Sequence, residues 1–364
     1  GSCPYVGAAG RVGPSPASPA RPMTLVTDIE QDRIAAAVFT STDIRITDKL
    51  TATLGARYTF EDIKGSGSGR HIYEDGVTAF NNRDGAGAAI GSNRIEENRI
   101  NFSSAVSWRP NERTTIYASF ANGYKSGGFN GEVQNNAAHF SNEGLFRAET
   151  VNAFELGYKG RPRDDLRIAG ALFYQDYNRP QARIFVAFPL PDGGVITSNS
   201  LSNLDSARSY GFEGEIALSP LSGLEIFTGF AFLESEIEQT ANIGGNAALF
   251  DGNPLPFASR FSTAASVKYE WRVTAATAGR ISANMKHQSA FYLDAEGLDS
   301  RRQAGYAIVD AEMAIVHNPS NLTLSLWARN VLDTEYAVSG FGFIGYNKFL
   351  GEPRTYGVRA SKQF

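Results

Sequence analysis

Residues 50–61, LTATLGARYTFE, alternate between apolar and polar side chains over their whole length. Leucine, alanine, tyrosine and phenylalanine occupy one set of alternate positions, while threonine, glycine, arginine and glutamate occupy the other. Successive side chains of a β-strand point to opposite faces of the sheet, so this pattern predicts a strand with one apolar and one polar face. The same alternation recurs in residues 99–109, 210–218 and 322–329.

Alternating segments of this kind fill the chain from about residue 33 to its carboxyl end. They come in pairs joined by very short turns, such as residues 47–49 and 318–320, and a longer polar segment separates most pairs. The thirteen strands that we predict lie near residues 33–46, 50–62, 98–109, 114–126, 149–160, 165–182, 203–219, 223–239, 259–270, 277–293, 305–317, 321–337 and 352–364. The longer connections lie near residues 63–97, 127–148, 183–202, 240–258, 294–304 and 338–351.

The alternation of short and long connections indicates a barrel that spans a membrane. Transmembrane barrels have short turns at one rim and long loops at the other, whereas a soluble β-sandwich or β-solenoid has no reason to place every long loop on one side. Inside a bilayer, closing the sheet into a barrel satisfies the backbone hydrogen bonds of every strand. The sequence therefore predicts an all-β fold, an antiparallel transmembrane β-barrel, with the soluble sandwich or solenoid as the alternative.

The composition agrees with a strand-rich protein. The 364 residues include 37 Gly, 24 Phe and 15 Tyr, a mixture that favours strands and turns. The net charge of -4 gives no electrostatic footprint for nucleic acid, so we expect no nucleic-acid partner. No run of apolar residues is long enough for a transmembrane helix.

The first residues differ from the rest of the chain. Residues 1–26 begin with a stretch rich in Pro, Gly and Ala that has no periodicity, and we predict a disordered tail there. Its single cysteine, Cys3, cannot form a disulfide within the chain. We assign residues 27–364 to the barrel.

Four internal segments and the carboxyl end carry a family resemblance. They are TIYASFANGYKSGGFN (115–130), FELGYKGRPRDDLRIAGALFYQDY (154–177), NLDSARSYGFEGEIALSPLSGLEIFTGFAFLESEI (203–237), LWARNVLDTEYAVSG (326–340) and GEPRTYGVRASKQF (351–364). In this order they resemble the barrel of TonB-dependent outer-membrane receptors of the iron-complex type. Each segment is a weak signal by itself, because β-strand patterns recur by chance, but five in the family's order are specific.

The resemblance implies a barrel of about 22 strands with a folded plug in its lumen, and a TonB box before the plug. Counted back from the carboxyl end, the thirteen predicted strands would be the last thirteen of such a barrel. We therefore expect this chain to be a C-terminal fragment of the barrel, with the plug absent. Since thirteen antiparallel strands cannot close with an antiparallel seam, we expect an open curved sheet or a poorly hydrogen-bonded seam.

The function implied by the resemblance is that of a receptor in the outer membrane of a Gram-negative cell. It would take up a ferric siderophore or a similar bulky chelate by TonB-dependent active transport. Its expected partners are the TonB complex, reached through the missing N-terminal region, the outer-membrane lipid, the barrel-assembly machinery and the siderophore-like ligand. Two alternatives stay open, a passive porin-like channel and a truncated product that transports nothing. The family also carries haem, cobalamin and sugars, so the cargo is not fixed.

Catalytic and metal chemistry find little support in the sequence. The four histidines have no metal-ligand spacing, and there is no cysteine cluster. We therefore expect no enzyme activity, no cofactor and no protein-bound metal. A Ser-His hydrolase assembled in space is the formal alternative, although no local feature points to one.

Residues in two of the predicted external loops are the candidate ligand contacts. External loops rich in aromatic residues are where a receptor of this type would hold a bulky ligand. The alternative is that these residues pack loop on loop or belong to an aromatic girdle. The candidates are Tyr124, Lys125, Phe129 and Asn130 in one loop, and Phe341, Phe343 and Tyr346 in the other.

The last predicted strand carries a candidate assembly signal. Tyr356, Val358 and Phe364 form a row of alternate apolar residues that ends in an aromatic. The resemblance implies that the barrel-assembly machinery recognises this row. Lys362 interrupts it, although its ammonium group can snorkel to water near the membrane interface.

Overall fold

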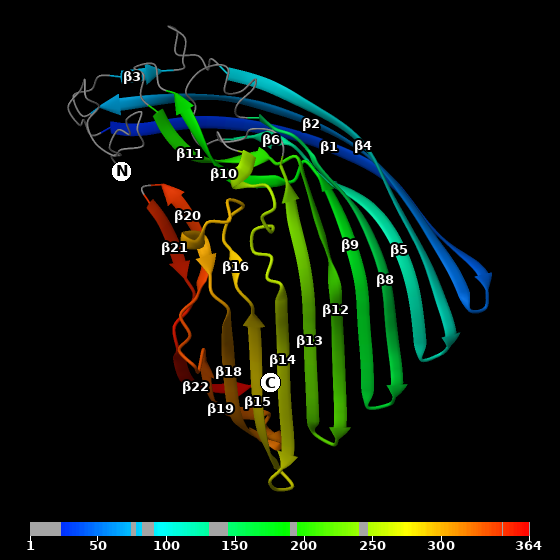
Figure 1. Ribbon diagram of the computed structural model, residues 1–364. Helices are drawn as coiled ribbons and strands as arrows, with labels where there is room; N and C mark the ends of the chain where they lie inside the picture. Colours follow the sequence, from blue (N-terminus) through cyan, green and yellow to red (C-terminus); the bar gives the residue numbers. More distant parts are fainter. Residues whose placement is uncertain are drawn as a thin grey trace.

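Figure 1 shows the computed structural model as one broad, strongly curved sheet whose strands run between two rims. The structure describes residues 23–73, 78–81, 91–130, 145–189, 195–239, 247–343 and 345–363. Short turns join the strands at one rim, which we call the short-turn rim, and longer segments gather at the other, which we call the long-loop rim (Figure 1).

Thirteen strands of the described residues follow one another in the main sheet, and neighbouring strands are antiparallel. The prediction of thirteen antiparallel strands is thereby confirmed. In order across the sheet they are β1 (Met23–Thr47), β2 (Leu50–Tyr73), β4 (Gly91–Asn111), β5 (Thr114–Lys125), β8 (Glu149–Arg163), β9 (Leu166–Asn178), β12 (Ser206–Leu221), β13 (Leu224–Glu238), β14 (Phe261–Arg272), β15 (Thr277–Gln288), β18 (Tyr306–His317), β19 (Leu322–Arg329) and β22 (Thr355–Lys362).

Smaller elements occupy the connections. β3 (Thr78–Asn81) pairs with β2, and four two-stranded sheets stand apart from the main sheet. These are β6 (Gly128–Phe129) with β7 (Leu145–Phe146), β10 (Gln181–Pro189) with β11 (Val195–Asn203), β16 (Phe291–Tyr292) with β17 (Arg302–Gln303), and β20 (Ala337–Phe343) with β21 (Gly345–Leu350). Short 3-10 helices lie at Ala247–Leu249, Asp299–Arg301 and Asn318–Ser320. Within the described ranges, no helix is both long and apolar enough to cross a membrane.

The structure corrects several expected boundaries. β1 begins at Met23, so residues 23–26, which we assigned to the tail, belong to a strand. They do so because β1 and β2 pair in one nearly unbroken ladder, from Met23 opposite Tyr73 down to the short turn. Two segments expected to be polar loops, 183–202 and 338–351, contain paired strands.

The two faces of the main sheet carry different side chains. Leu156 pairs with Ala118 and Leu172 on one face, whereas the adjacent Glu155 lies on the other face, opposite Ser119 and Phe173. Side chains of this second face, from strands as far apart as β5 and β15, line one common cavity. Only the concave side of a curved sheet allows this, so we call the concave face the lumen face and the convex face the outer face.

Large apolar side chains remain exposed along the whole outer face. Their exposed fractions range from 44% to 75% for Ile281, Leu54, Leu172, Phe102, Met313, Leu324, Leu326 and Val358. In water a continuous apolar band of this size would promote association. The same band is what a transmembrane barrel presents to lipid, with polar side chains confined to the lumen face.

Buried packing is concentrated at the long-loop rim and not between layers. The largest buried cluster joins Ala182 and Ile184 of β10 to Ile237 of β13 and to Phe250 and Ala295 of two separate connections. Smaller clusters unite Ile63 with Phe129, and Phe291 with Leu293 and Ala337. The rim is therefore an ordered structure held by its own apolar contacts.

Two of the short turns use residues with left-handed backbone conformations. Gly223, between β12 and β13, has a φ of +82°, and a Cβ atom there would overlap the backbone oxygen of Glu270. Asn321 closes the turn between β18 and β19 with a φ of +50°. Glycine and asparagine tolerate this region better than other residues, so the sequence fits the turns.

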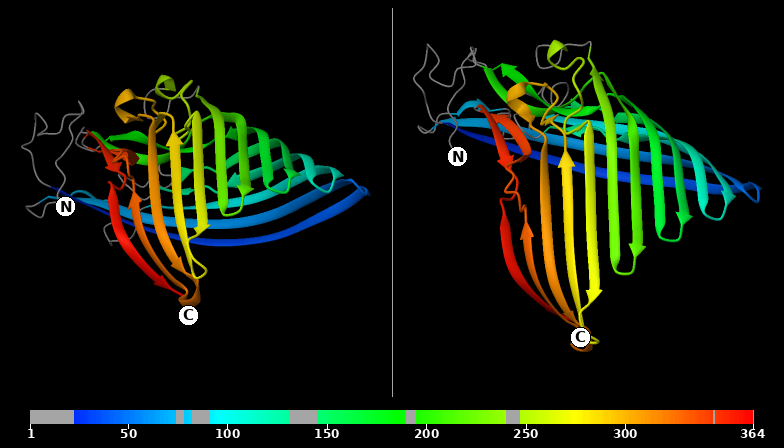
Figure 2. Two further views of the ribbon diagram at one scale, coloured as in Figure 1. Left: turned by 90° about the horizontal axis from the view of Figure 1, so that it is seen from below. Right: turned by 60° about the horizontal axis from the view of Figure 1, so that its bottom comes forward.

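β1 and β22 form the two edges of the sheet. Among the described residues no ladder joins these strands, and the order of the sheet runs from one to the other. Figures 1 and 2 show their ends at the short-turn rim far apart.

Candidate functional site

A hairpin folds inward across the long-loop rim. β10 and β11 connect β9 with β12 but leave the main sheet, turning at Arg179, whose φ is +56°. β11 lies against β7 on one side and β20 on the other, although these strands follow β5 and β19 at distant parts of the barrel wall. The hairpin therefore covers part of the lumen (Figure 1).

Side-chain amides hold this hairpin in place. Asn130 donates from Nδ2 to the Leu201 backbone oxygen at 2.7 Å and accepts from the Leu201 backbone N–H at 2.9 Å. Gln181 donates from Nε2 to the Ser126 backbone oxygen at 2.9 Å. Because Asn130 is buried, with 6% of its surface exposed, these bonds are shielded from water.

A cavity of about 540 Å³ lies beneath the hairpin. Most of its wall is apolar, from Pro180, Ala182, Leu201, Leu204, Leu255, Pro256, Phe257 and Leu293. The polar part of its lining includes Gln181, Asp294, Glu296 and Tyr346. A mostly apolar cavity with a few fixed polar groups is the usual form of a small-molecule site.

A half-buried ion cluster borders this cavity, which Asp294, Glu296 and Tyr346 line. Arg301 Nη1 lies 3.1 Å from Asp294 Oδ2 and 2.6 Å from Glu296 Oε2, and its guanidinium lies 5.2 Å from the Tyr346 ring centroid. Burial alone would lower the pKa of Arg301, but the two carboxylates outweigh it, so the pKa is raised. Burial, together with the Asp294 charge, raises the pKa of Tyr346. Both groups therefore keep their ordinary protonation states at neutral pH.

A second cavity, of about 480 Å³, lies next to the first, and Gln181 and Leu201 line both. Tyr124 and Lys125 line this second cavity. The Arg99 guanidinium lies 5.9 Å from the Tyr124 ring centroid.

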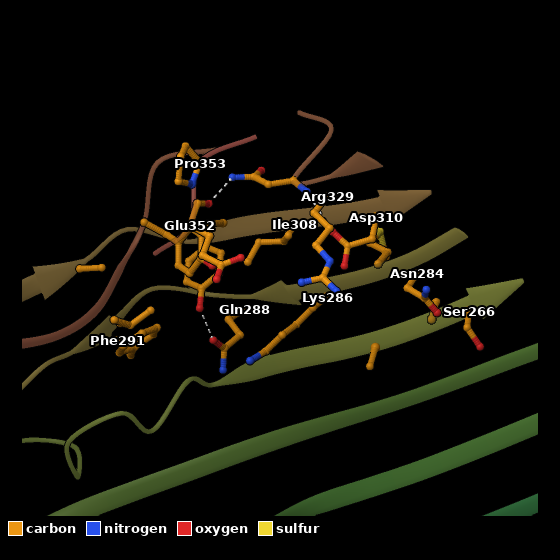
Figure 3. Close-up of a pocket in the computed structure, with 18 of the residues that line it drawn as sticks. Ser266, Asn284, Lys286, Gln288, Phe291, Ile308, Asp310, Arg329, Glu352 and Pro353 are labelled. Carbon is orange, nitrogen blue, oxygen red and sulfur yellow. Dashed lines mark hydrogen bonds between the residues drawn. The ribbon is translucent and has the colours of Figure 1, made fainter. Parts of the chain in front are cut away.

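A larger cavity of about 900 Å³ lies on the lumen face below the rim (Figure 3). Lys286 of β15, Asp310 of β18 and Arg329 of β19 line it, and Figure 3 shows their side chains reaching into the same space. Phe257 lines this cavity as well as the 540 Å³ cavity, so the two meet at its ring.

The structure places the predicted contact residues in different environments. Tyr124, Lys125 and Tyr346 line cavities. Phe129 packs on Ile63 with 7% of its surface exposed, and Asn130 holds β11, so both take part in packing within the rim. The backbones of Phe341 and Phe343 belong to β20, and their side chains lie outside the described residues.

The predicted assembly row lies at the edge of the sheet. Tyr356 and Val358 of β22 are on the outer face, opposite Ala328 and Leu326. They are 80% and 75% exposed. Phe364 lies outside the described residues.

Several site residues were not predicted from the sequence. Asp294, Glu296 and Arg301 come from one connection, DAEGLDSR, whose charge pattern was visible but whose fold was not. Lys286 and Arg329 come from strands that are not neighbours, and only the sheet order brings them together. Over the part of the chain that the structure describes, no three His, Cys, Asp or Glu side chains gather as a metal site.

The fold and the cavities together define a class, a transmembrane β-barrel with an inward-folded rim. The model of the family "TonB dependent receptor-like, beta-barrel" matches residues 5–331. The chain therefore belongs to the TonB-dependent receptor family, whose members are outer-membrane proteins.

Solved structures of similar fold have low sequence identity. The ferric yersiniabactin uptake receptor FyuA from Yersinia pestis is 20% identical, with a TM-score of 0.72 over 96% of this chain and 48% of that one. The siderophore receptor PiuA from Acinetobacter baumannii is 18% identical, with a TM-score of 0.69 over 94% and 44%. The ferric-catecholate import receptor Fiu from E. coli K12 is 17% identical, with a TM-score of 0.66 over 91% and 45%. The chain thus spans less than half the length of these three proteins.

Proposed function

We propose that the protein is part of an outer-membrane receptor that takes up a ferric siderophore or a similar bulky chelate by TonB-dependent active transport. The observation that carries this proposal is the inward-folded rim, where β10 and β11 cover adjoining cavities lined by aromatic and polar side chains. A rim of this kind offers a selective binding surface, whereas a diffusion pore needs an open water-filled mouth. The names of the structural relatives, three receptors for iron chelates, support the same function.

Binding would depend on the chelate and not on protein ligands to the metal. Iron would arrive already coordinated, so the site needs only groups that contact an organic shell. Uptake requires a difference in affinity between two states of the receptor, and no covalent chemistry is involved. On this proposal the protein is not an enzyme.

The partners follow from the same proposal. The outer face would contact outer-membrane lipid, and energy would come from the TonB complex acting on a plug with its TonB box. Tyr356, Val358 and Phe364 would be the row that the barrel-assembly machinery recognises. Deleting Phe364 should then lower the amount of heat-resistant, membrane-inserted barrel while leaving secretion unchanged.

The test is uptake of iron-55 by cells that make the native gene product as their only iron-chelate receptor. A panel of aryl, hydroxamate and citrate chelates would be supplied, with and without a functional TonB complex. We expect uptake of at least one chelate, and its loss when TonB is deleted. Uptake that persists without TonB would support the porin-like alternative, and no uptake of any chelate would support the non-transporting one.

A further inference from the structure

A continuous row of aromatic rings lines the upper wall of the 900 Å³ lumen cavity. The centroids of Phe257 and Phe291 are 6.0 Å apart, those of Phe291 and Tyr306 are 6.4 Å apart, and Tyr306 stacks on Tyr336 at 4.8 Å. The row begins at Phe257, which also lines the cavity beneath the hairpin. The aromatic row thus runs from the 540 Å³ cavity beneath the hairpin into the 900 Å³ lumen cavity, along the path of a ligand that would pass from one to the other.

Two cations lie at the lumen end of this row. Lys286 faces the lumen from β15, and Arg329 does so from the end of β19. Neither forms an ion pair with a carboxylate in the described residues, whereas three other lumen cations do. Lys268 lies 3.5 Å from Glu225, Arg280 lies 2.9 Å from Glu270, and Arg359 lies 3.5 Å from Glu312.

The arginine is held in position by its neighbours. Its guanidinium lies 5.7 Å from the Trp327 ring, and Trp327 itself lies over Gly357, where a Cβ atom would come within 2.6 Å of the ring. A side chain that is already ordered loses less entropy when it binds an anion.

The acidic groups of the cavity do not neutralise these cations by contact. Asp310 Oδ1 accepts the Asn330 backbone N–H at 2.9 Å, so that carboxylate is already engaged with the backbone. Glu352 also lines the cavity and is exposed. The arrangement leaves two cationic donors facing the space next to stacked aromatic rings.

We propose that this cavity is a binding subsite for an aromatic anion, such as the aryl-oxygen face of a chelate. The ring would stack on Phe257, which is 49% exposed, and on Tyr306, and the anionic oxygens would accept hydrogen bonds from Lys286 and Arg329. This inference rests on the proposed function and narrows its substrate class to anionic aryl chelates. A neutral chelate without aromatic rings would gain nothing from either half of the subsite.

The native gene product, purified in detergent, allows a direct test because a reporter lies at the subsite. Of the three tryptophans in this sequence, Trp327 lies on the lumen face beside Arg329, and Trp108 and Trp271 lie on the outer face. The iron(III) complex of 2,3-dihydroxybenzoate, which is aromatic and anionic, should quench Trp327 fluorescence with saturation. Iron(III) acetohydroxamate is the non-aromatic comparison, and Trp327→Phe should remove the signal.

Charge-removing variants decide the role of the cations. Lys286→Gln combined with Arg329→Gln should weaken binding of the aryl complex by about tenfold to hundredfold, the usual effect of losing hydrogen bonds to a charged group. Acetohydroxamate binding should change less than twofold, and Arg329→Lys should keep much of the aryl affinity. The matched control is Lys268→Gln, which removes a lumen lysine that already has a carboxylate partner, and it should behave as the wild type.

Two results would overturn the inference. One is equal aryl affinity in the double variant and the wild type; a lower thermal midpoint of the double variant in that case would show that the cations hold a folded segment and not a ligand. The other is binding of the aryl complex, detected by calorimetry, without any change in Trp327 fluorescence. TonB-dependent iron uptake measured in the same strains would leave the proposed function standing in each case, and its absence would remove both.

Discussion

Replacing Val106 by arginine would test which face of β4 contacts lipid. Val106 lies on the outer face, opposite Ala52 and Ala118, and is 46% exposed. It precedes Asn111, the last residue of β4 at the short-turn rim, by five positions. At about 3.4 Å per residue and a tilt of about 40°, this distance is a rise of about 13 Å, close to the middle of an apolar band about 25 Å tall.

The expected cost depends on depth and on face. An arginine near the midplane on the lipid side costs about 2–4 kcal/mol of unfolding free energy, and one near an interface costs about 0–1 kcal/mol. Phe102, on the same face but four residues further along β4, would lie about 23 Å above the turn, near the upper interface. Ser103 is exposed on the lumen face, so an arginine there should cost almost nothing.

The measured quantity should be the difference between the arginine and alanine variants at each position, because each change also removes a side chain. Urea unfolding of the native gene product in lipid vesicles, followed by tryptophan fluorescence, gives the free energies by linear extrapolation. We expect the difference to fall in the order Val106, Phe102, Ser103. A difference at Ser103 as large as that at Val106 would refute the assignment of the two faces.

Three other predictions concern the rims. An epitope inserted at Gly252 should bind antibody on intact cells, whereas one at Asp48, in a short turn, should not; labelling at Asp48 would reverse the orientation. Asn130→Ala should leave the Leu201 N–H unpaired at a cost of about 1–3 kcal/mol and accelerate its hydrogen exchange, while unchanged exchange would show that Asn130 does not hold the hairpin. Because burial raises the pKa of Tyr346 above its ordinary 10.0, the un-ionised phenol stabilises the fold fully below pH 10.0, and this contribution is lost as the pH rises toward the folded-state pKa. Absorbance at about 295 nm, compared with Tyr346→Phe, should show no ionisation of this residue near pH 10; ordinary titration there would contradict the burial.

The strands of the wall could be predicted because their physical cause is local. In residues 50–61 each side chain faces either the lipid or the lumen, so apolar and polar residues alternate with a period of two along the strand. The short turns were also predicted in place, although two of them extend one residue further than we expected: Gly223 and Asn321, which we assigned to strands, have a positive φ and belong to the turns. Periodicity alone therefore identified the sheet and its thirteen strands.

The rim could not be predicted because its causes are distant in sequence. Asn130 lies at the end of a segment that looked like a ligand-binding loop, but its amide pairs with Leu201, 71 residues further along the chain. The first strand of the hairpin, β10, ends in the apolar run of residues 184–189, which we assigned to a loop because of its position between two strands of the wall. A connection's length does not reveal whether its backbone groups are satisfied by water or by a second strand.

At the edges of the sheet the same question arises for backbone groups in lipid, namely which partners accept or donate their hydrogen bonds. Thirteen antiparallel strands leave β1 and β22 running in the same direction, so joining them would require a parallel seam. β1 has 25 residues and β22 has 8, so such a seam would leave about 17 residues of β1 (25 minus 8) unpaired. Each unpaired N–H or C=O group that faces hydrocarbon costs several kcal/mol of free energy, which is more than any side-chain contact at the seam contributes to stability. The edge of β1 therefore fits a partner strand of about its own length.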